Sequence, residues 1–532
     1  MTRSVMSHEF SQSPQANIPR SQFNRSCGYK TTFDAGYLVP VFVDEALPGD
    51  TFNCRMTAFA RLATPLHPFM DNLFMDSFFF AVPVRLIWNN WQKFNGEQTD
   101  PGDSTDYVVP TMTSTAGTGY LSGSLHDYFG LPTEVPGLVH SSLWHRAYNL
   151  VYNDWFRDEN LQGSVIVDLD DGPDSPTDYV LLRRGKRHDY FTSALPWPQK
   201  GPAVELPLGT RAPVYGIGPI TGQATDPTDV TIWQGDGSTV ASLNSWTLNS
   251  NGVRINATGS GTPSSSNYPN IYADLSAATA ATINQLREAF QIQKLYERDA
   301  RGGTRYTEVI RAHFGVISPD ARLQRPEYLG GGSTVVNVNP IPQTSSTDAT
   351  TPQGNLAAMG TCSIHGHGFS KSFTEHCIII GMVATRADLN YQQGLDRMFS
   401  RSTRFDFYWP ALSHIGEQEV LNKEIYAVGS ANPTQDDAVF GYQERYAEYR
   451  YKPSKITGQF RSNYASTLDS WHLAQDFTSL PALNSTFIEE NPPVDRVIAV
   501  TSQPHFLFDS FFSLKCARPM PVYSVPGLID HF

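Results

Sequence analysis

The chain has 532 residues, of which 40% are hydrophobic and 12% aromatic, enough to bury a substantial core. This length exceeds the usual size of one domain, so we expect either one large domain with long insertions or two domains. The formal net charge of −13 argues against a protein that condenses nucleic acid alone, because binding the phosphate backbone requires clustered lysines and arginines.

Charged residues make up only 17% of the chain, below the roughly one quarter of an average soluble domain. Low charge, together with 40 glycines and 37 prolines that supply turns, suits a subunit that covers much of its surface with copies of itself. A large secreted β-sandwich would have the same composition, so composition alone does not decide between the two.

Cysteines and apolar runs bear on the compartment. The five cysteines form no Cys-x-x-Cys pair, which predicts reduced thiols in a protein made in a cytoplasm. The first ten residues lack the apolar stretch of a signal peptide. The most apolar segment, residues 69–88, is interrupted by Asp71, Asp76 and Arg85, so its uncharged run is shorter than the roughly 18 residues of a spanning helix. We expect a core segment and no membrane insertion.

The first third of the chain alternates between extended and loop patterns. Residues 1–32 are polar and contain Pro14 and Pro19, which predicts a weakly ordered, extended N-terminal arm. Residues 33–94 have the pattern of strands joined by Pro-Gly turns, and residues 99–140 are a loop rich in Gly, Ser, Thr and Pro.

Two segments have helical periodicity. In residues 142–158 the apolar positions step by three and four after a serine cap, which predicts a helix. A second helix is expected over residues 276–300, where Gly302 and Gly303 would end it.

The remaining β-type runs are short, and they are expected at residues 335–338, 377–380, 404–408 and 497–500. Many short strands with long excursions predict a mainly β fold, an eight-stranded antiparallel jelly-roll β-sandwich with long loop insertions and a few helices. In this division, residues 33–215 hold the first part of the jelly roll, and residues 276–532 hold a helix, the remainder of the jelly roll and a C-terminal segment. The aromatic segments 74–80, 88–94 and 442–451 are expected to divide between core and subunit contacts.

Residues 216–275 differ from the rest of the chain. They contain only five charged residues, of which Arg254 is the one basic residue, and they are dominated by Thr, Ser, Gly and Asn. This composition is often that of a disordered linker. Trp233, Trp246 and the spaced hydrophobic residues instead favour a partly folded insertion.

Long, irregular sequence blocks frame almost the whole chain outside residues 200–275. One of them is the run Tyr-Glu-Arg-Asp-Ala-Arg-Gly-Gly-Thr-Arg-Tyr at residues 296–306, and the others lie at residues 19–59, 61–94, 313–331 and 441–451. Together these blocks resemble the major capsid protein of gokushoviruses, small single-stranded-DNA phages of the microvirus family.

The resemblance implies a structural virion protein and no enzyme, with neither a catalytic residue nor a metal or other cofactor. It implies self-assembly into a T=1 icosahedral shell around a circular single-stranded DNA genome, in the cytoplasm of a bacterial host. The expected partners are further copies of the chain, the packaged DNA, a small basic DNA-binding protein, a pilot protein and a receptor on the host-cell surface.

The resemblance also gives two surface segments a candidate role. The densest basic run supplies the candidate DNA-facing residues Arg183, Arg184, Lys186 and Arg187. Solvated loops, or ion pairs with acidic segments such as residues 168–174, are the other interpretation of this run.

The insertion at residues 216–275 is expected to gather at the threefold axes into a protrusion that meets the host. The candidate host-facing residues there are Trp233, Trp246, Arg254 and Tyr268.

Two other function classes remain open from the sequence. A β-rich adhesin or carbohydrate-binding protein could use residues 216–275 as its binding surface. A metal-dependent, cupin-like enzyme could use His365, His367 and Glu375, because two histidines at i and i+2 share one face of a regular strand. The seven residues between His367 and Glu375 break the spacing that cupins use, and paired strand polar residues at a subunit contact are the simpler interpretation.

Overall fold

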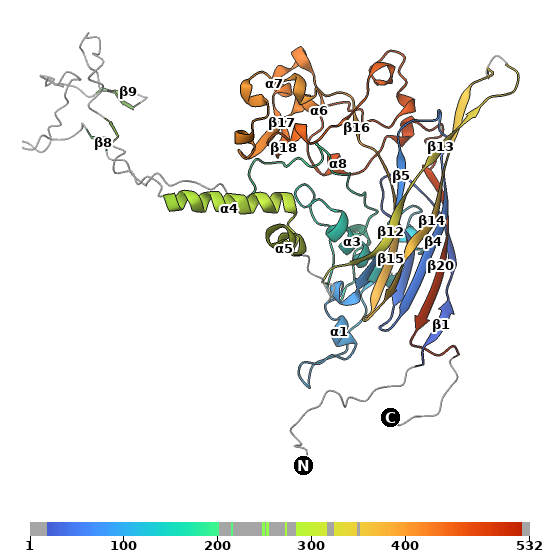
Figure 1. Cartoon of the computed structure of the whole chain (residues 1–532). Coiled ribbons are helices and arrows are strands. Elements are labelled where there is room, and N and C mark those ends of the chain that lie inside the picture. The colour runs from blue at the N-terminus through green and yellow to red at the C-terminus, as the bar shows by residue number, and fades with distance from the viewer. Residues whose placement is uncertain are drawn as a thin grey trace, which may run out of the picture. The chain divides into compact units, whose positions relative to one another are not determined.

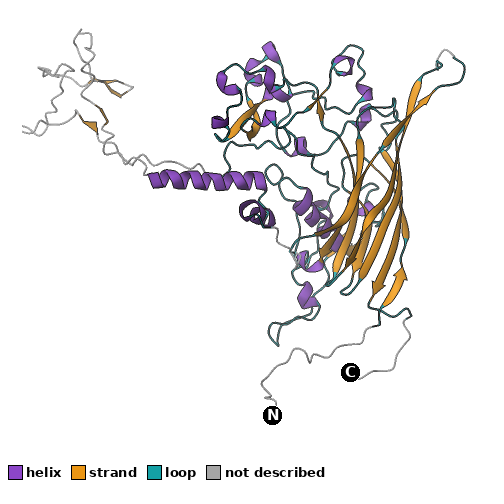
Figure 2. Cartoon of the chain, in the orientation of Figure 1, coloured by secondary structure: helices purple, strands orange, loops and turns teal. Residues whose placement is uncertain are grey.

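The computed structural model describes residues 19–201, 214–215, 247–249, 252–254, 272–273, 283–316, 324–347 and 352–523. The chain divides into two compact units. The first contains residues 1–198 and 303–532, and the second contains residues 199–302. Strands dominate the first unit, with short helices beside them (Figure 2).

Two antiparallel sheets form the centre of the first unit (Figure 1). The larger has the order β1-β20-β4-β14-β13, with β2 also paired to β20, and the smaller has the order β12-β5-β15-β3. The larger sheet consists of β1 (Ser21–Asn24), β2 (Cys27–Phe33), β4 (Thr51–Leu62), β13 (Asn337–Pro342), β14 (Leu356–Ser372) and β20 (Phe506–Arg518). The smaller consists of β3 (Val39–Ala46), β5 (Leu73–Pro83), β12 (Glu327–Val335) and β15 (Cys377–Ala387).

The predicted mainly β, antiparallel sandwich is confirmed. Four long strands, β2, β4, β14 and β20, lie in one sheet, and four others, β3, β5, β12 and β15, lie in the other. Along the chain, β2, β3, β4 and β5 alternate between the two sheets, as do β12, β14, β15 and β20. This four-and-four division is the one that an eight-stranded jelly roll requires.

Aromatic side chains fill the space between the two sheets. Phe42 and Phe512 lie with ring centroids 4.9 Å apart, and Phe79 contacts Phe369 at 5.5 Å. Each of these rings is at least 93% buried. Burying one such side chain contributes about 1.5–3 kcal/mol, so this layer supplies much of the stability of the unit.

The two sheets differ in what covers their second face. Every residue of β15 is buried, because Ile378 and Ile380 pack on the far side against Ala147 and Tyr148 of helix α3 (Leu143–Val151). In β4 and β20, by contrast, buried and exposed residues alternate. The larger sheet therefore has one face in the core and one open face.

The predicted helix at 142–158 is confirmed as α3, which continues as a π-helical turn over Tyr152–Phe156. Its Arg146 has no solvent exposure and is held by Asp174, with Nη2–Oδ1 at 2.5 Å and Nε–Oδ2 at 2.6 Å. Trp88 donates from Nε1 to the neighbouring Asp171 at 2.7 Å. The acidic run at 168–174 is thus fixed by donors from the core of the same subunit.

The second predicted helix is confirmed as α4 (Ile283–Gly302) in the second unit, and it ends before Gly303, whose φ is +92°. The predicted N-terminal part, residues 276–282, lies outside the described residues. The second unit also contains two short antiparallel pairs, β8 (Val214–Tyr215) with β11 (Tyr272–Ala273) and β9 (Thr247–Asn249) with β10 (Gly252–Arg254).

Two predicted strands are wrong. At residues 404–408 there is no strand: Arg404–Asp406 form a 3-10 turn, in which the Asp406 carboxylate accepts hydrogen bonds from the backbone N–H groups of Ser402 and Thr403 at 2.9 and 2.7 Å. Residues 497–500 form no strand either. Val497 and Ile498 are buried core residues, and only an isolated bridge joins Ile498 to Pro65.

Other predicted extended segments are present in the structure with different boundaries. The run at 377–380 begins β15, whereas residues 335–338 contain the end of β12 and the start of β13. Residues 21–24 and 27–33, expected in a weakly ordered arm, are β1 and β2 and pair with β20. These residues are extended as predicted but belong to the sheet, and residues 1–18 of the arm lie outside the described residues.

A smaller core lies beside the sandwich in the first unit, around Phe191, Tyr391, Ile425 and Phe487. Its elements are β16 (Asn390–Tyr391), β17 (Glu417–Leu421), β18 (Val439–Glu444), β19 (Ser454–Lys455), α6 (Asn422–Ile425), α7 (Pro433–Asp436) and α8 (Ser485–Ile488). The remaining elements of the unit are α1 (Trp91–Phe94), α2 (Leu125–Tyr128), α5 (Tyr306–Phe314), β6 (Thr111–Thr113) and β7 (Val139–Ser141).

The apolar segment at 69–88 forms β5 and a following turn, as the prediction of a core segment requires. Among the residues that the structure describes, no helix is both long enough and apolar enough to cross a membrane.

Three histidines lie close together at α3, which itself contains His145. His126 Nδ1 lies 2.8 Å from His145 Nε2, and His140 Nε2 lies 2.7 Å from the Tyr120 hydroxyl. Burial lowers the pKa of His126 from 6.5 to about 4 and lowers the pKa of His145 well below its ordinary value. The folded chain therefore holds both rings neutral at a pH where the unfolded chain would begin to protonate them.

We predict that the free energy of unfolding is constant above the unfolded pKa of 6.5 and falls as the pH drops from there towards about 4. Below pH 6.5 the unfolded chain binds more protons at these positions than the folded chain. Urea unfolding of the full-length chain at several pH values measures this slope. His126→Gln should flatten it, and an unchanged slope in this variant would contradict the prediction.

Candidate functional site

The basic run at 183–187 lies mostly inside the subunit. The guanidinium of Arg183 lies over the Tyr37 ring at 4.1 Å and donates to the Glu490 carbonyl and the Asn491 side chain at 3.1 and 3.0 Å. These contacts hold the loop against the sandwich, so Arg183 acts within the fold.

Arg184 belongs to a buried ion cluster. Its Nη1 and the Nε of Arg386 both contact Asp76 Oδ2, at 2.5 and 2.9 Å. Although burial raises the pKa of Asp76, hydrogen bonds from Ser333 and Arg184 and the two positive charges lower it overall. The carboxylate thus stays charged and ties the basic loop to β5 and β15.

The last two residues of the run differ from each other. Lys186 is desolvated, which lowers its pKa, and it donates from Nζ to the Phe487 carbonyl at 2.7 Å. Arg187 is exposed. The structure therefore does not gather the four predicted side chains into one basic surface, and DNA contact stays a prediction that fits only Arg187.

Three of the four candidate host-facing residues, Trp233, Trp246 and Tyr268, lie outside the described residues. Arg254 is the last residue of β10, opposite Thr247 of β9. At the base of the insertion, β8 and β11 pair so that Tyr215 lies opposite Tyr272. The chain thus leaves and re-enters the insertion at neighbouring positions.

The histidines considered as metal ligands do not share one strand face, and that prediction is wrong. A bulge in β14 leaves His365 and Gly366 without partners on β4, and Gly366 has a φ of +76°. His365 is exposed, whereas His367 turns inward to the Ser77 and Thr334 hydroxyls at 2.8 and 3.2 Å. An inserted residue reverses the alternation of side chains on which the prediction depended.

The remaining candidate ligand, Glu375, is paired with Arg85 at 2.8 Å. Within the described part of the chain, no three His, Cys, Asp or Glu side chains lie close enough together to hold a metal ion.

A surface that the sequence did not single out lies beside the smaller core. Two segments, residues 395–409 and 445–451, present large apolar side chains together with arginines. We call this the aromatic–arginine surface. Its exposed members are Leu395, Met398, Phe399, Phe405, Phe407, Tyr408, Trp409, Tyr449 and Tyr451. Phe399, Phe405 and Phe407 are 68%, 62% and 52% exposed, which is unusual for so many neighbouring aromatic side chains.

Contacts between the two segments hold this surface in shape. Tyr446 Oη and Arg445 Nη2 both donate to the Phe405 carbonyl, at 3.1 and 2.8 Å. The Tyr408 ring packs on Tyr446 and Tyr449 at centroid distances of 5.3 and 6.2 Å. The exposed rings therefore sit on a fixed scaffold and are preorganised for a contact.

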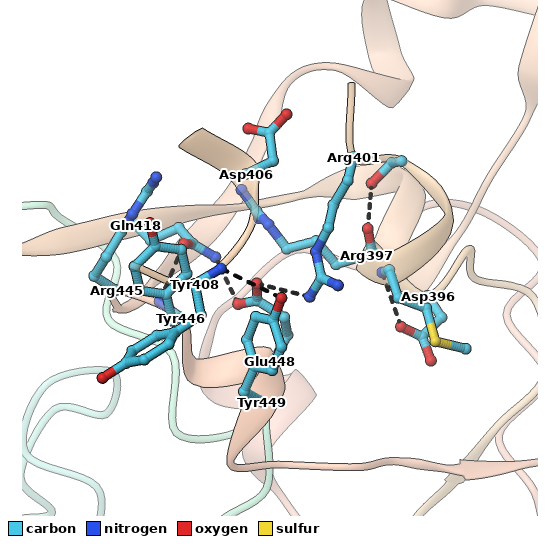
Figure 3. Close-up of polar contacts among 12 residues, drawn as sticks. Asp396, Arg397, Arg401, Asp406, Tyr408, Gln418, Arg445, Tyr446, Glu448 and Tyr449 are labelled. Atoms are coloured by element: carbon cyan, nitrogen blue, oxygen red, sulfur yellow. Dashed lines mark hydrogen bonds and ion pairs between the residues drawn. The ribbon is translucent and has the colours of Figure 1, made fainter. Parts of the chain in front are cut away.

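Arginines are stacked between these rings. Arg401 lies 4.3 Å from the Tyr449 ring centroid and contacts Glu448 at 3.3 Å, as Figure 3 shows. Arg404 lies over Trp409 at 4.5 Å and Arg445 over Tyr446 at 4.6 Å. Aromatic residues and arginine are the side chains enriched at the centres of protein–protein interfaces.

A cavity of about 300 Å³ opens beside this surface and is lined by Tyr190, Arg397, Arg401, Glu424 and Tyr449, among others. Tyr190 and Arg397 both donate to the Glu424 carboxylate at 2.8 Å. Burial raises the pKa of Glu424 in spite of these two donors. Because both Glu424 oxygens are held from inside the subunit, this arrangement positions the loop that carries Arg397 and the aromatic residues after it.

Sequence reasoning came close to this surface without identifying it. Residues 442–451 contain both core and exposed aromatic residues, since Tyr446 is 3% exposed and Tyr449 is 50% exposed, and their division between core and subunit contacts stays a prediction. Residues 404–408 were assigned to a strand. The signal that the sequence offered was the density of aromatic residues and arginines between 397 and 409, in a segment that has no regular alternation.

Comparison with known proteins gives one family. The family model described as "Capsid protein (F protein)" matches residues 11–528. Capsid protein VP1 of Bdellovibrio phage phiMH2K is 52% identical over 531 aligned residues, which cover 99% of this chain and 98% of the relative.

Two further relatives carry the same name. Capsid protein VP1 of Chlamydia phage 1 is 46% identical, with 99% of this chain and 98% of the relative covered. Capsid protein VP1 of Spiroplasma virus 4 is 38% identical, with 98% and 97% covered. These relatives are structural proteins and not enzymes. The chain belongs to the capsid protein (F protein) family, and within it to the major capsid proteins of the gokushovirus type.

Proposed function

We propose that this chain assembles into a T=1 icosahedral shell that encloses a circular single-stranded DNA phage genome. The observation that carries the proposal beyond the family is the aromatic–arginine surface. A lone subunit leaves this apolar, preorganised surface in water, and a neighbouring copy would cover it. A closed shell needs such heterologous contacts, whose rotations close around symmetry axes.

The charge of the chain supports a division of labour inside the shell. With a net charge of −13, the subunit does not neutralise a genome by itself. We therefore propose that a small basic protein of the phage takes most of the DNA charge and that a pilot protein accompanies the DNA. Assembly would take place in the cytoplasm of the host bacterium.

The insertion at 216–275 is proposed to form a protrusion at the threefold axes that contacts the host-cell surface. Two observations support an appendage: residues 199–302 form a compact unit of their own, and the β8–β11 pair closes the base of the insertion. Such an appendage can be lost without touching the strands of the sandwich. Trp233, Trp246, Arg254 and Tyr268 remain its candidate contact residues.

We predict that replacing Phe405 and Phe407 together by Ala lowers the yield of shells at least tenfold, because both rings would lie at a subunit contact. The replacements leave no cavity in the core, so the melting temperature should stay within a few degrees. Electron microscopy of the chain, expressed with and without the other phage proteins, measures assembly. Phe314→Ala, at a position in α5 that is 77% exposed, is the matched control.

Normal shells from the double variant would contradict the role of this surface. If the unaltered chain gave only small soluble oligomers even beside the other phage proteins, the shell proposal itself would fail and the adhesin alternative would replace it.

We predict that removing residues 216–271 leaves assembly intact and abolishes infection. Tyr215 and Tyr272 are Cα partners in the β8–β11 pair, so a Gly-Ser linker can join them without moving either strand. Shell yield by sedimentation and adsorption to host cells are measured separately. Loss of shells would show a role in assembly, and full infectivity would exclude a role in attachment.

We predict opposite effects for two neighbours in the basic run. Arg187→Gln removes an exposed charge, and if this residue faces DNA it should lower the genome content of purified particles with no change in stability. Arg184→Gln should instead cost about 1.5–3 kcal/mol in the free energy of unfolding, since it removes a hydrogen bond to a buried carboxylate. Unchanged DNA content in the Arg187 variant would remove this run from the DNA contacts.

A further inference from the structure

The larger sheet presents an open face on which exposed residues of β4 and β20 alternate with buried ones. In β4 the residues Asn53, Arg55, Thr57, Phe59 and Arg61 alternate with buried ones and are all exposed. The helices of the first unit lie on the other side of the sandwich, next to the smaller sheet (Figure 2). Among the described residues of the unit, no helix covers this face.

Two phenylalanines lie on this face, at exposed positions where side chains are normally polar. Phe59 of β4 is 45% exposed and Phe511 of β20 is 53% exposed. Phe59 lies opposite Asp509 and Phe511 lies opposite Thr57, which makes the two residues diagonal neighbours, whose backbone positions in an antiparallel pair are about 7–8 Å apart.

The surroundings of the two rings are small and polar. Phe511 lies opposite Gly28 of β2, and Phe59 lies opposite Ser363 of β14. Because glycine and serine add little bulk, a flat group can approach both rings. The hollow next to Phe59 is lined by Thr32, Arg61 and Leu507, among others.

The charge of this face is opposite to that of the chain. Its cations are Lys30, Arg55, Arg61 and Lys515, and its anion is Asp509. Lys30 is paired with Asp509 at 2.9 Å. Arg55, Arg61 and Lys515 make no ion pair within the described residues, so this face has three uncompensated positive charges in a chain of net charge −13.

The arrangement along β4 places the charges on both sides of a ring. Arg55 and Arg61 point to the same face as Phe59, which lies between them in the alternation. Sites that hold single strands combine cations that follow the phosphate backbone with aromatic rings on which bases stack. A second copy binding through the same face would bring these cations against each other.

We propose that the open face of the larger sheet binds single-stranded DNA without sequence preference. Phe59 and Phe511 stack on bases, while Arg55, Arg61 and Lys515 contact phosphates. The inference rests on the proposed function in that it takes the genome of the shell as the ligand. It assigns the DNA contact of the sandwich to this face, separate from the run at 183–187.

The first test uses the full-length unassembled chain and a fluorescent mixed-sequence 20-nucleotide single strand, with anisotropy as the readout. Phe59→Leu with Phe511→Leu should weaken binding at least fivefold, whereas Phe59→Tyr with Phe511→Tyr should keep it, because only the second pair retains the rings. Phe314→Leu, at an exposed position of α5 outside both surfaces, is the control and should bind like the unaltered chain.

The second test measures salt dependence. Each phosphate contact contributes about −0.7 to the slope of log K against log salt for a single strand. Arg55→Gln with Arg61→Gln should therefore make the slope shallower by about 1.4. An unchanged slope, or equal affinity of the Leu and Tyr variants, would overturn the inference.

The third test separates this inference from the shell itself. Particles made from the Leu variant should be normal in number by electron microscopy and should contain less DNA. Normal particles with normal DNA content would overturn the DNA assignment and leave the shell proposal intact. Loss of particles with full oligonucleotide binding would also overturn it, because the face would then be a subunit contact. Absence of particles from the unaltered chain would count against the shell proposal alone.

Discussion

Burial of the four-stranded sheet on both faces is the constraint on which the rest of the subunit depends. Every residue of β15 is buried, and the apolar run around Ile378 and Ile380 demands cover on each side. The larger sheet covers one side and α3 with its loops covers the other. The loops that cover this sheet are themselves held by buried ion pairs, such as the pair between Arg146 of α3 and Asp174.

The same constraint determines which charged side chains are paired inside the subunit and which stay exposed. Charges that enter the core are paired with opposite charges, as Asp76 is through Oδ2 with Arg184 and Arg386. An unpaired buried charge would cost several kcal/mol, so Arg183, Arg184 and Lys186 of the basic run contact groups inside the subunit, and Arg187 is the exposed cation of the run. Arg55 and Arg61 are exposed and make no ion pair within the described residues, so they are available to contact a ligand. Charge density in the sequence is therefore a poor guide to function here.

The sequence predicted what depends on local pattern. The strand pattern over residues 33–94, the β-type run at 377–380 and the three-and-four spacing at 142–158 each predicted elements that the structure contains. The sequence prediction failed where a side-chain hydrogen bond, a bulge or a contact between distant segments determines the structure. The Asp406 carboxylate turns residues 404–408 away from a strand, and the bulge at Gly366 separates His365 from His367. The aromatic–arginine surface joins segments some 40 residues apart through contacts such as Tyr446 with Phe405, which no local pattern encodes.

The two exposed aromatic surfaces differ in the kind of partner that they fit. On the aromatic–arginine surface, Arg401 is paired with Glu448, and Arg401, Arg404 and Arg445 all stack on aromatic rings, so exposed rings dominate the surface. Such a surface gains most from a partner that excludes water, which is what a second subunit offers. On the open sheet face the rings are fewer, and Arg55, Arg61 and Lys515 make no ion pair within the described residues, whereas Lys30 is paired with Asp509. A flexible polyanion therefore gains more there than a folded acidic protein does. We therefore propose that an acidic capsid subunit binds two kinds of partner at separate surfaces. One surface has arginines stacked on aromatic rings, and the other has exposed arginines without a carboxylate partner among the described residues.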